Sequence, residues 1–202
     1  MLAVSKSVPA ERLRLAVAAG MDEFGENRVQ DAEAKAGQLP GARWQLVGQL
    51  QANKAARAVV LFETIHSLDS LRLARRLSAL VEARGGPRGR RLAVYLQVNV
   101  DDDPAKAGFG PADVERELPG LAGLPGLELL GLMTVGRLVR RPEDARPTFD
   151  RLRRLSERLR ATDDRLGAGL SMGMSDDFEI AVEEGATVVR VGRAIFGDRP
   201  SL

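Results

Sequence analysis

The sequence contains no cysteine and only one histidine, His66. The absence of cysteine excludes disulfides and thiolate metal sites, and a lone histidine argues against a histidine-based metal site or a Ser-His-Asp triad. No apolar run approaches the roughly 20 residues that span a membrane, and the N-terminus lacks the charged segment and long apolar core of a secretory signal. We therefore expect a cytoplasmic protein with no metal and no membrane partner.

Lysine is scarce as well. Among 30 basic residues only Lys6, Lys35, Lys54 and Lys106 are lysine. Unlike arginine, lysine can lose its proton and attack a carbonyl as an amine. Lys6 follows an apolar run at 2–4, so we expect it at the end of a buried strand, as a candidate Schiff-base nucleophile. The alternative is a solvated lysine just beyond the strand, because most lysines are exposed.

The charge of the chain is nearly balanced, with 30 basic against 28 acidic residues and a net charge of +2. The densest basic segment, 84–91, carries glycines and no aromatic residue. Such a segment is typical of a solvated loop, whereas a nucleic-acid footprint needs a clustered basic face. We therefore expect no nucleic-acid partner.

Strand-like and helix-like patterns alternate through the whole sequence. Strands are expected at 2–4, 23–24, 44–47, 64–66, 92–100, 127–133, 169–171 and 187–191, and helices at 9–19, 27–36, 53–61, 71–84, 111–118, 143–160, 177–184 and 194–196. Eight strand–helix units of about 25 residues each predict an α/β, single-domain (β/α)₈ TIM barrel over residues 1–202. A doubly wound open sheet is the alternative, but no glycine-rich dinucleotide turn follows the first strand.

In such a barrel the functional groups gather where the strands end. The expected ends bring an amine, amides, hydroxyls and an arginine to one mouth: Lys6, Asn27, Gln49, His66, Asn99, Thr134, Ser175 and Arg190. No pair of carboxylates is placed for glycoside hydrolysis.

Two segments at this mouth suit an oxyanion. Residues 171–177 join the seventh strand to a helix, with small residues that allow a ligand close to the backbone and a hydroxyl on Ser175. After the eighth strand, Gly192 and Arg193 can offer backbone N–H groups. The alternative for Ser175 is a helix N-cap. Together with Lys6, these segments favour a phosphorylated carbonyl ligand.

Arg190 lies in a valine-rich strand that should be buried on both faces. A buried guanidinium is costly unless it is paired or hydrogen-bonded. It therefore forms either an internal salt bridge, to Glu26 or Asp69, or a donor contact to a ring nitrogen of a bound cofactor.

These residues make a recognisable set. The strand-one lysine, the Ser-Met-Gly-Met-Ser segment at 171–175 and the arginine-glycine segment at 190–192 are a specific combination. The chain resembles the pyridoxal 5′-phosphate homeostasis proteins, a family related to the barrel domain of bacterial alanine racemases. The similarity covers nearly the whole chain in order, with matching segments at 2–6, 24–27, 48–54, 65–69, 97–99, 106–108, 131–133, 171–177 and 189–197.

The resemblance implies a pyridoxal phosphate cofactor held as a Schiff base on Lys6. It implies cofactor-binding roles for Asn27 near the ring, Arg190 facing the pyridine nitrogen, Ser175, Gly192 and Arg193 at the phosphate, and Met133 at the end of the sixth strand. Two departures stand out: relatives begin with a helix ahead of the first strand, and many carry threonine or serine where this chain has Arg193.

The resemblance further implies a carrier or buffer of the cofactor with little or no catalysis, and with pyridoxal-phosphate-dependent apoenzymes as recipients. We expect a monomer, because the sequence lacks the second domain that dimerises the racemases. The related racemases take a tyrosine from a second domain of the partner subunit, whereas Tyr95 lies mid-strand here. His66 is expected to be a strand-end packing residue, with a catalytic base as the alternative. A low-activity amino-acid racemase and a cofactor-free Schiff-base aldolase are the competing functions.

Overall fold

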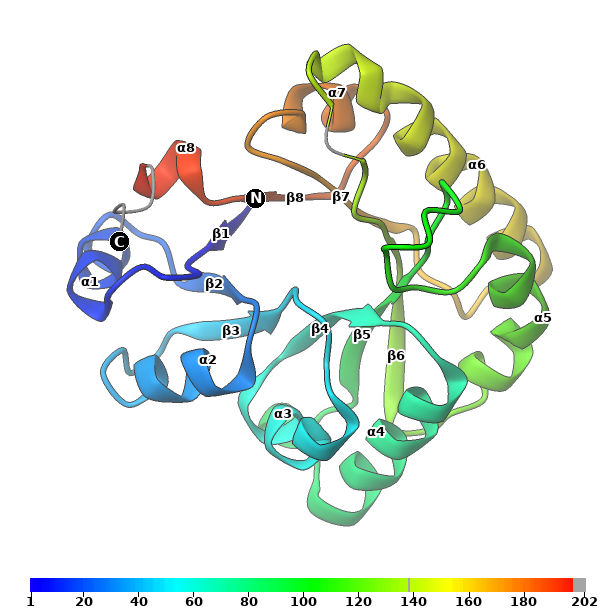
Figure 1. Cartoon of the computed structure of the whole chain (residues 1–202). Coiled ribbons are helices and arrows are strands. Elements are labelled where there is room, and N and C mark those ends of the chain that lie inside the picture. Colours follow the sequence, from blue (N-terminus) through cyan, green and yellow to red (C-terminus); the bar gives the residue numbers. More distant parts are fainter. Residues whose placement is uncertain (138, 198–202) are drawn as a thin grey trace.

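The computed structural model describes residues 1–137 and 139–197. Eight parallel strands close into a barrel in sequence order, and the helices surround it (Figure 1). The strands are β1 (Leu2–Val4), β2 (Glu23–Glu26), β3 (Arg43–Leu46), β4 (Thr64–Leu68), β5 (Leu92–Gln97), β6 (Leu127–Met133), β7 (Gly169–Met174) and β8 (Val188–Val191). The predicted (β/α)₈ barrel is confirmed, and the open-sheet alternative is wrong. Residues 198–202 of the predicted domain lie outside the described residues.

The helices between the strands are α1 (Ala10–Ala18), α2 (Val29–Ala36), α3 (Ala55–Leu61), α4 (Leu71–Arg84), α5 (Pro111–Ala122), α6 (Arg146–Thr162), α7 (Phe178–Glu183) and α8 (Arg193–Phe196). Short 3₁₀ turns cover Ala52–Lys54, Pro87–Gly89 and Pro142–Ala145. Among the described residues, none of these helices has the length and apolar character needed to cross a membrane.

Closure of the barrel depends on β1, which pairs with β2 on one side and β8 on the other. Ala3 is in register with Phe24 of β2 and with Val191 of β8. All strands run in the same direction, so their C-terminal ends form one rim. The residues that follow β1, β2, β3 and β8 are therefore neighbours in space, although they come from both ends of the sequence.

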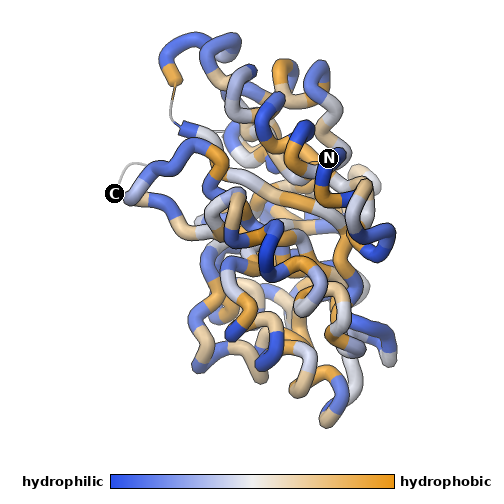
Figure 2. The backbone as a smooth tube through the Cα atoms, turned by 90° about the vertical axis from the view of Figure 1, so that its right-hand side faces the viewer, coloured by the Kyte–Doolittle hydropathy of each residue, from blue (hydrophilic) through white to orange (hydrophobic). Residues whose placement is uncertain are grey.

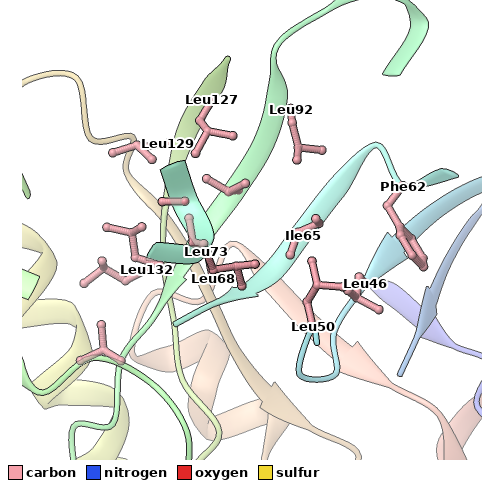
Figure 3. Packing of buried hydrophobic residues seen from close by; sticks show 14 of the residues in the cluster. Leu46, Leu50, Phe62, Ile65, Leu68, Leu73, Leu92, Leu127, Leu129 and Leu132 are labelled. Atoms are coloured by element: carbon pink, nitrogen blue, oxygen red, sulfur yellow. The ribbon is translucent and has the colours of Figure 1, made fainter. Parts of the chain in front are cut away.

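The strands separate an apolar layer from a polar one. Phe24, Leu46 and Ile65 are fully buried in the hydrophobic core, and Figure 3 shows Leu46 close to Leu50 of the following loop. Alternate residues of a strand point to opposite faces, so their neighbours face the barrel interior. Figure 2 shows the same separation, with hydrophobic segments through the middle and hydrophilic ones mostly at the periphery.

The largest differences in length between predicted and observed strands are in β5 and β7. The predicted strand at 92–100 ends at Gln97, because Asn99 N then donates to Phe109 O (2.9 Å) in the next loop. The weak strand predicted at 169–171 continues to Met174. Its two glycines and one serine lack the branched side chains that mark a strand in sequence, so the local pattern underestimates the length of β7.

Candidate functional site

Lys6 lies at the mouth of the barrel, directly after β1, on a short turn with fixed geometry. Ser5 N donates to Gly25 O (2.9 Å), and Val8 N donates back to Ser5 O (2.9 Å). Ser7 adopts a φ of 63°, in the left-handed region that side chains rarely occupy. The turn therefore holds the partly buried Lys6 at the rim of the barrel and does not let it extend freely from the strand.

A buried ion pair supports this turn from behind. Glu26 is fully buried, and its Oε1 accepts from Lys35 Nζ (2.5 Å) and from Ser5 Oγ (2.6 Å). Lys35 Nζ also donates to Ser5 O (2.8 Å). The carbonyl of the residue before Lys6 is thus bound by an ammonium whose own position is set by a carboxylate.

We predict that Lys35→Met lowers the free energy of unfolding by about 3–5 kcal/mol, because it leaves the carboxylate of Glu26 buried without its cation. The double variant Glu26→Gln/Lys35→Met should recover part of that loss, since no charge then remains. Urea unfolding measures both. Glu26→Gln alone completes the comparison. If the double variant loses as much free energy of unfolding as Lys35→Met and Glu26→Gln lose together, the two side chains do not stabilise each other.

Arg190 reaches into the barrel interior from β8. Its Nη1 donates to Ser171 Oγ (2.9 Å) and its Nη2 to Thr134 O (2.8 Å), and the residue is only 5% exposed. Burial lowers the pKa of Arg190 to about 10, partly offset by the charge of Asp177, so the guanidinium stays charged at neutral pH. A guanidinium has five N–H groups; two serve these bonds and three remain for another acceptor.

The predicted alternative, a salt bridge from Arg190 to Glu26 or Asp69, is wrong. Glu26 instead pairs with Lys35, and Asp69 accepts from Gln49 Nε2 (3.2 Å). Among the described residues, no carboxylate forms an ion pair with Arg190. The oxygen atoms of Ser171 and Thr134 accept two hydrogen bonds from Arg190, but they are uncharged and do not neutralise the guanidinium.

A chain of hydrogen bonds crosses the interior from Arg190 to the far strands. His66 Nδ1 lies 2.8 Å from Ser171 Oγ, and His66 Nε2 lies 2.7 Å from Gln45 Oε1. The amide oxygen of Gln45 only accepts, so Nε2 carries the ring proton and Nδ1 accepts from the serine hydroxyl. The oxygen of Ser171 then accepts from Arg190. Each group in this series donates to the next, from Arg190 through Ser171 and His66 to Gln45.

His66 packs inside the barrel as predicted, although it lies in the middle of β4 and not at its end, and it is not an available base. Burial, and secondarily the charge of Arg190, lower the pKa of His66 to about 3. Both ring nitrogens are occupied, and the ring stacks on Tyr95 with centroids 4.7 Å apart. Burial also raises the pKa of Tyr95. The two side chains considered for acid–base roles are thus locked together inside the barrel.

This neutral histidine gives a pH prediction. The ring takes up a proton near pH 6.5 in the unfolded chain but only near pH 3 in the folded one. The unfolded state therefore binds more protons across this window, and the free energy of unfolding falls as pH drops, by about 1.4 kcal/mol per pH unit at most. His66→Gln removes the titratable ring, and with it this pH dependence, and supplies an amide that can form hydrogen bonds in its place. Urea unfolding at pH 7 and pH 4.5 measures this difference. The free energy of unfolding should fall more between the two pH values in wild type than in His66→Gln; an equal fall in both proteins would contradict the assignment.

The two predicted oxyanion segments contact each other. Ser175 Oγ accepts from Gly192 N (3.3 Å), and a Cβ on Gly192 would lie 3.1 Å from Val4 O. The N-cap alternative for Ser175 is wrong, because α7 starts at Phe178 after Asp177. The segment is instead closed by Asp177 Oδ1, which accepts from Met174 N (2.6 Å).

The guanidinium of Arg193 is engaged by a neighbouring carboxylate. Its side chain forms an ion pair with Asp176 and is about half exposed. As the first residue of α8, Arg193 has a backbone N–H that the helix itself does not use. The backbone of Arg193, next to Gly192 and Ser175, is therefore the part of this residue that can meet an oxyanion.

The remaining predicted residues lie at two places on the rim. Asn27 follows β2 and lines the same pocket as Lys6. Met133 ends β6, is fully buried and is in register with Ser171. The structure thus groups Lys6 with Asn27, and Ser175 with Gly192. Sequence reasoning missed Gln45 in the interior chain, although a polar residue between Trp44 and Leu46 of a buried strand was a usable signal.

Comparison with known proteins agrees with this geometry. The family model described as the alanine racemase N-terminal domain matches residues 2–200. The pyridoxal phosphate homeostasis protein of Pseudomonas aeruginosa is 41% identical over 202 residues, which cover 98% of this chain and 84% of that protein. PipY of Synechococcus elongatus solved without PLP is 44% identical with a TM-score of 0.90, and PipY solved with PLP bound is 42% identical with a TM-score of 0.89. Both cover 97% of this chain and 91% of PipY.

Proposed function

Because the chain belongs to the alanine racemase N-terminal domain family and, within it, to the pyridoxal phosphate homeostasis proteins, we propose that it binds pyridoxal 5′-phosphate as a Schiff base on Lys6. Its role is then to hold and release the cofactor inside the cell, with little or no catalysis. A related protein of 42% identity has been solved with PLP bound, which supports this assignment over a cofactor-free aldolase.

The residues of this chain fit such a cofactor. Lys6 offers the amine for the aldehyde, and the hydroxyl of Ser175 and the backbone N–H of Arg193 offer donors for a phosphate. The N–H of Gly192, which donates to Ser175 Oγ, would turn to the phosphate when it binds. Asn27 shares the pocket of Lys6, and Met133 is buried at the end of β6, next to Thr134. These are the residues that we propose hold the group.

Arg190 is the single observation that carries the functional conclusion. It is a buried cation with three N–H groups to spare and no carboxylate partner among the described residues, a placement that suits an uncharged acceptor such as a pyridine nitrogen. Bound pyridoxal phosphate draws electrons from an amine substrate into its ring, most strongly when the ring nitrogen is protonated. Arginine can only donate, so Arg190 facing that nitrogen would leave it unprotonated and would weaken this withdrawal of electrons.

The interior also disfavours the racemase alternative. A racemase needs a proton donor on each face of the cofactor. The ring nitrogens of His66 are both engaged, its pKa is lowered to about 3, and Tyr95 is stacked against it. We therefore propose that Lys6 holds the cofactor without a second acid or base to assist it.

The test is uptake and delivery. Purified protein mixed with pyridoxal phosphate and passed over a desalting column should retain one cofactor per chain with a visible absorption band. An apoenzyme that requires the cofactor, as the recipient class that we propose, should then become active when mixed with the loaded protein. Failure to retain the cofactor would overturn the proposed function. We propose that residues 1–202 form one domain, and that the protein acts as a monomer in the cytoplasm. Sedimentation velocity measures its oligomeric state.

A further inference from the structure

A polar pocket of about 510 Å³ opens beside Lys6 at the mouth of the barrel. It lies on the β2–β3 side of β1, whereas β8 and the Ser175–Gly192 contact lie on the other side; Figure 1 shows this order of strands. The lining residues are Lys6, Asn27, Arg28, Val29, Gln30, Gly48, Gln49, Leu50, Gln51 and Lys54. Its volume is that of a small-molecule site.

The lining is cationic and contains no acid. It carries three cations and four amides, in a chain that has almost as many acidic as basic residues. Lys35 and Lys106 each form an ion pair, with Glu26 and Asp103. Over the described part of the chain no such pair exists for Lys54 or Arg28. Unneutralised cations around a cavity attract an anion into it.

The fold accounts for some residues of this lining and leaves others unexplained. Gly48 is required because a Cβ there would lie 2.3 Å from Asn27 O. Ser67 Oγ holds Gly48 O (2.6 Å), and Leu50 anchors the loop in the core at 5% exposure. A hydrogen bond and a buried side chain therefore anchor the loop. The ammonium of Lys54 serves none of these contacts, although the loop places it in the pocket wall.

We propose that this pocket binds the carboxylate of an α-amino acid whose amine displaces Lys6 from the cofactor. The inference rests on the proposed function. The phosphate end of the cofactor is assigned to the β7–β8 side, so the β2–β3 side is left for the incoming amine. An α-amino acid carries its carboxylate one carbon from its amine, which places the negative charge within this cationic pocket when the nitrogen is beside Lys6. Arg28 and Lys54 bind the carboxylate, with Asn27 as an amide donor.

The exchange is balanced without any further reactant. The amine nitrogen of the amino acid forms the new bond to the cofactor carbon, and the bond from that carbon to Lys6 Nζ breaks. The carbon–nitrogen bonds that form and break are double bonds, so the two protons that the incoming neutral amine loses pass to Nζ, and Lys6 leaves as a neutral –NH₂ group. The pocket favours the approach of amines that carry a carboxylate over those that do not.

The test compares L-alanine with alaninamide, which has the same amine environment and no carboxylate, at equal concentrations of free amine. On cofactor-loaded wild type, alanine should displace Lys6 faster, followed as the change in the visible band. In Arg28→Gln/Lys54→Gln this preference should fall about tenfold, since a hydrogen bond to a charged group contributes on that order, while the rate with alaninamide stays unchanged. Arg75→Gln, on the exposed surface of α4, is the matched control and should keep the preference.

A cofactor-free readout separates this inference from the proposed function. Saturation-transfer NMR with acetate as the probe should give a clearly weaker signal with the cofactor-free double variant than with wild type and Arg75→Gln; the anion-binding groups outside Arg28 and Lys54 are the same in all three proteins. An equal preference for alanine in wild type and double variant, or equal acetate signals, would overturn the inference even if the cofactor binds. A chain that never takes up pyridoxal phosphate overturns the proposed function, and the acetate signal then decides alone whether the pocket binds carboxylates.

Discussion

Lys6→Ala is expected to retain no cofactor through desalting and to show no visible band with pyridoxal phosphate. Lys35 and Lys106 do not offer a replacement at the same place. The ammonium of Lys35 is held by Glu26 and Ser5 O, and that of Lys106 donates to Val135 O (2.9 Å). Loss of the only amine at the end of β1 therefore removes the covalent attachment entirely, with only phosphate and ring contacts left.

Lys54→Ala is the matched control for this prediction. Lys54 lines the same pocket as Lys6 but comes from the loop after β3, so its loss should leave the band in place. Thermal unfolding of the two variants should agree closely, because neither ammonium supports the fold. A Lys6→Ala protein as yellow as wild type would place the attachment on another residue.

Arg190→Glu is expected to have the second large effect, on both chemistry and stability. A carboxylate opposite the pyridine nitrogen favours its protonation and so strengthens the withdrawal of electrons. Exchange of the α-hydrogen of alanine for deuterium by the loaded protein should rise at least about tenfold, which corresponds to roughly 1.4 kcal/mol of barrier. NMR of alanine in D₂O measures this rate.

The same substitution removes the donor to Ser171 Oγ and Thr134 O and brings a second acid near Asp177. The cofactor-free variant should therefore unfold more easily by about 3–5 kcal/mol, and added cofactor should stabilise it more than it stabilises wild type. Arg190→Gln keeps a neutral donor and is the control: its exchange rate should stay at the wild-type level. Equal exchange rates in Arg190→Glu and Arg190→Gln would contradict the proposal that Arg190 faces the ring nitrogen.

The fold was predictable because its signals are local. Each strand–helix unit carries its own apolar pattern and turn residues, and counting the units gives the barrel and the order of strand ends. Lys6, Asn27 and Ser175 could be placed at one mouth on that basis alone. The family resemblance then supplied roles that no pattern of apolar residues contains.

Contacts across the barrel could not be predicted in the same way. His66 and Ser171 are 105 residues apart in the chain, and their contact depends on the register of strands that are not adjacent. Glu26 was a candidate partner for Arg190, but successive strand residues face opposite sides, and Glu26 points outward to Lys35 on α2. The N-cap alternative for Ser175 failed because α7 begins at Phe178, after Asp177, and the hydroxyl of Ser175 instead accepts from the backbone of Gly192, which follows β8.

The most direct test of covalent attachment at Lys6 is borohydride reduction of the cofactor-loaded wild-type protein, followed by peptide mass spectrometry. Reduction converts a carbon–nitrogen double bond into a stable single bond and fixes the cofactor to the amine that held it. The expected result is loss of the visible band and a single modified peptide that contains residues 2–7, with the added mass on Lys6. Modification confined to Lys54 or Lys106, or a protein that carries no added mass, would contradict the account.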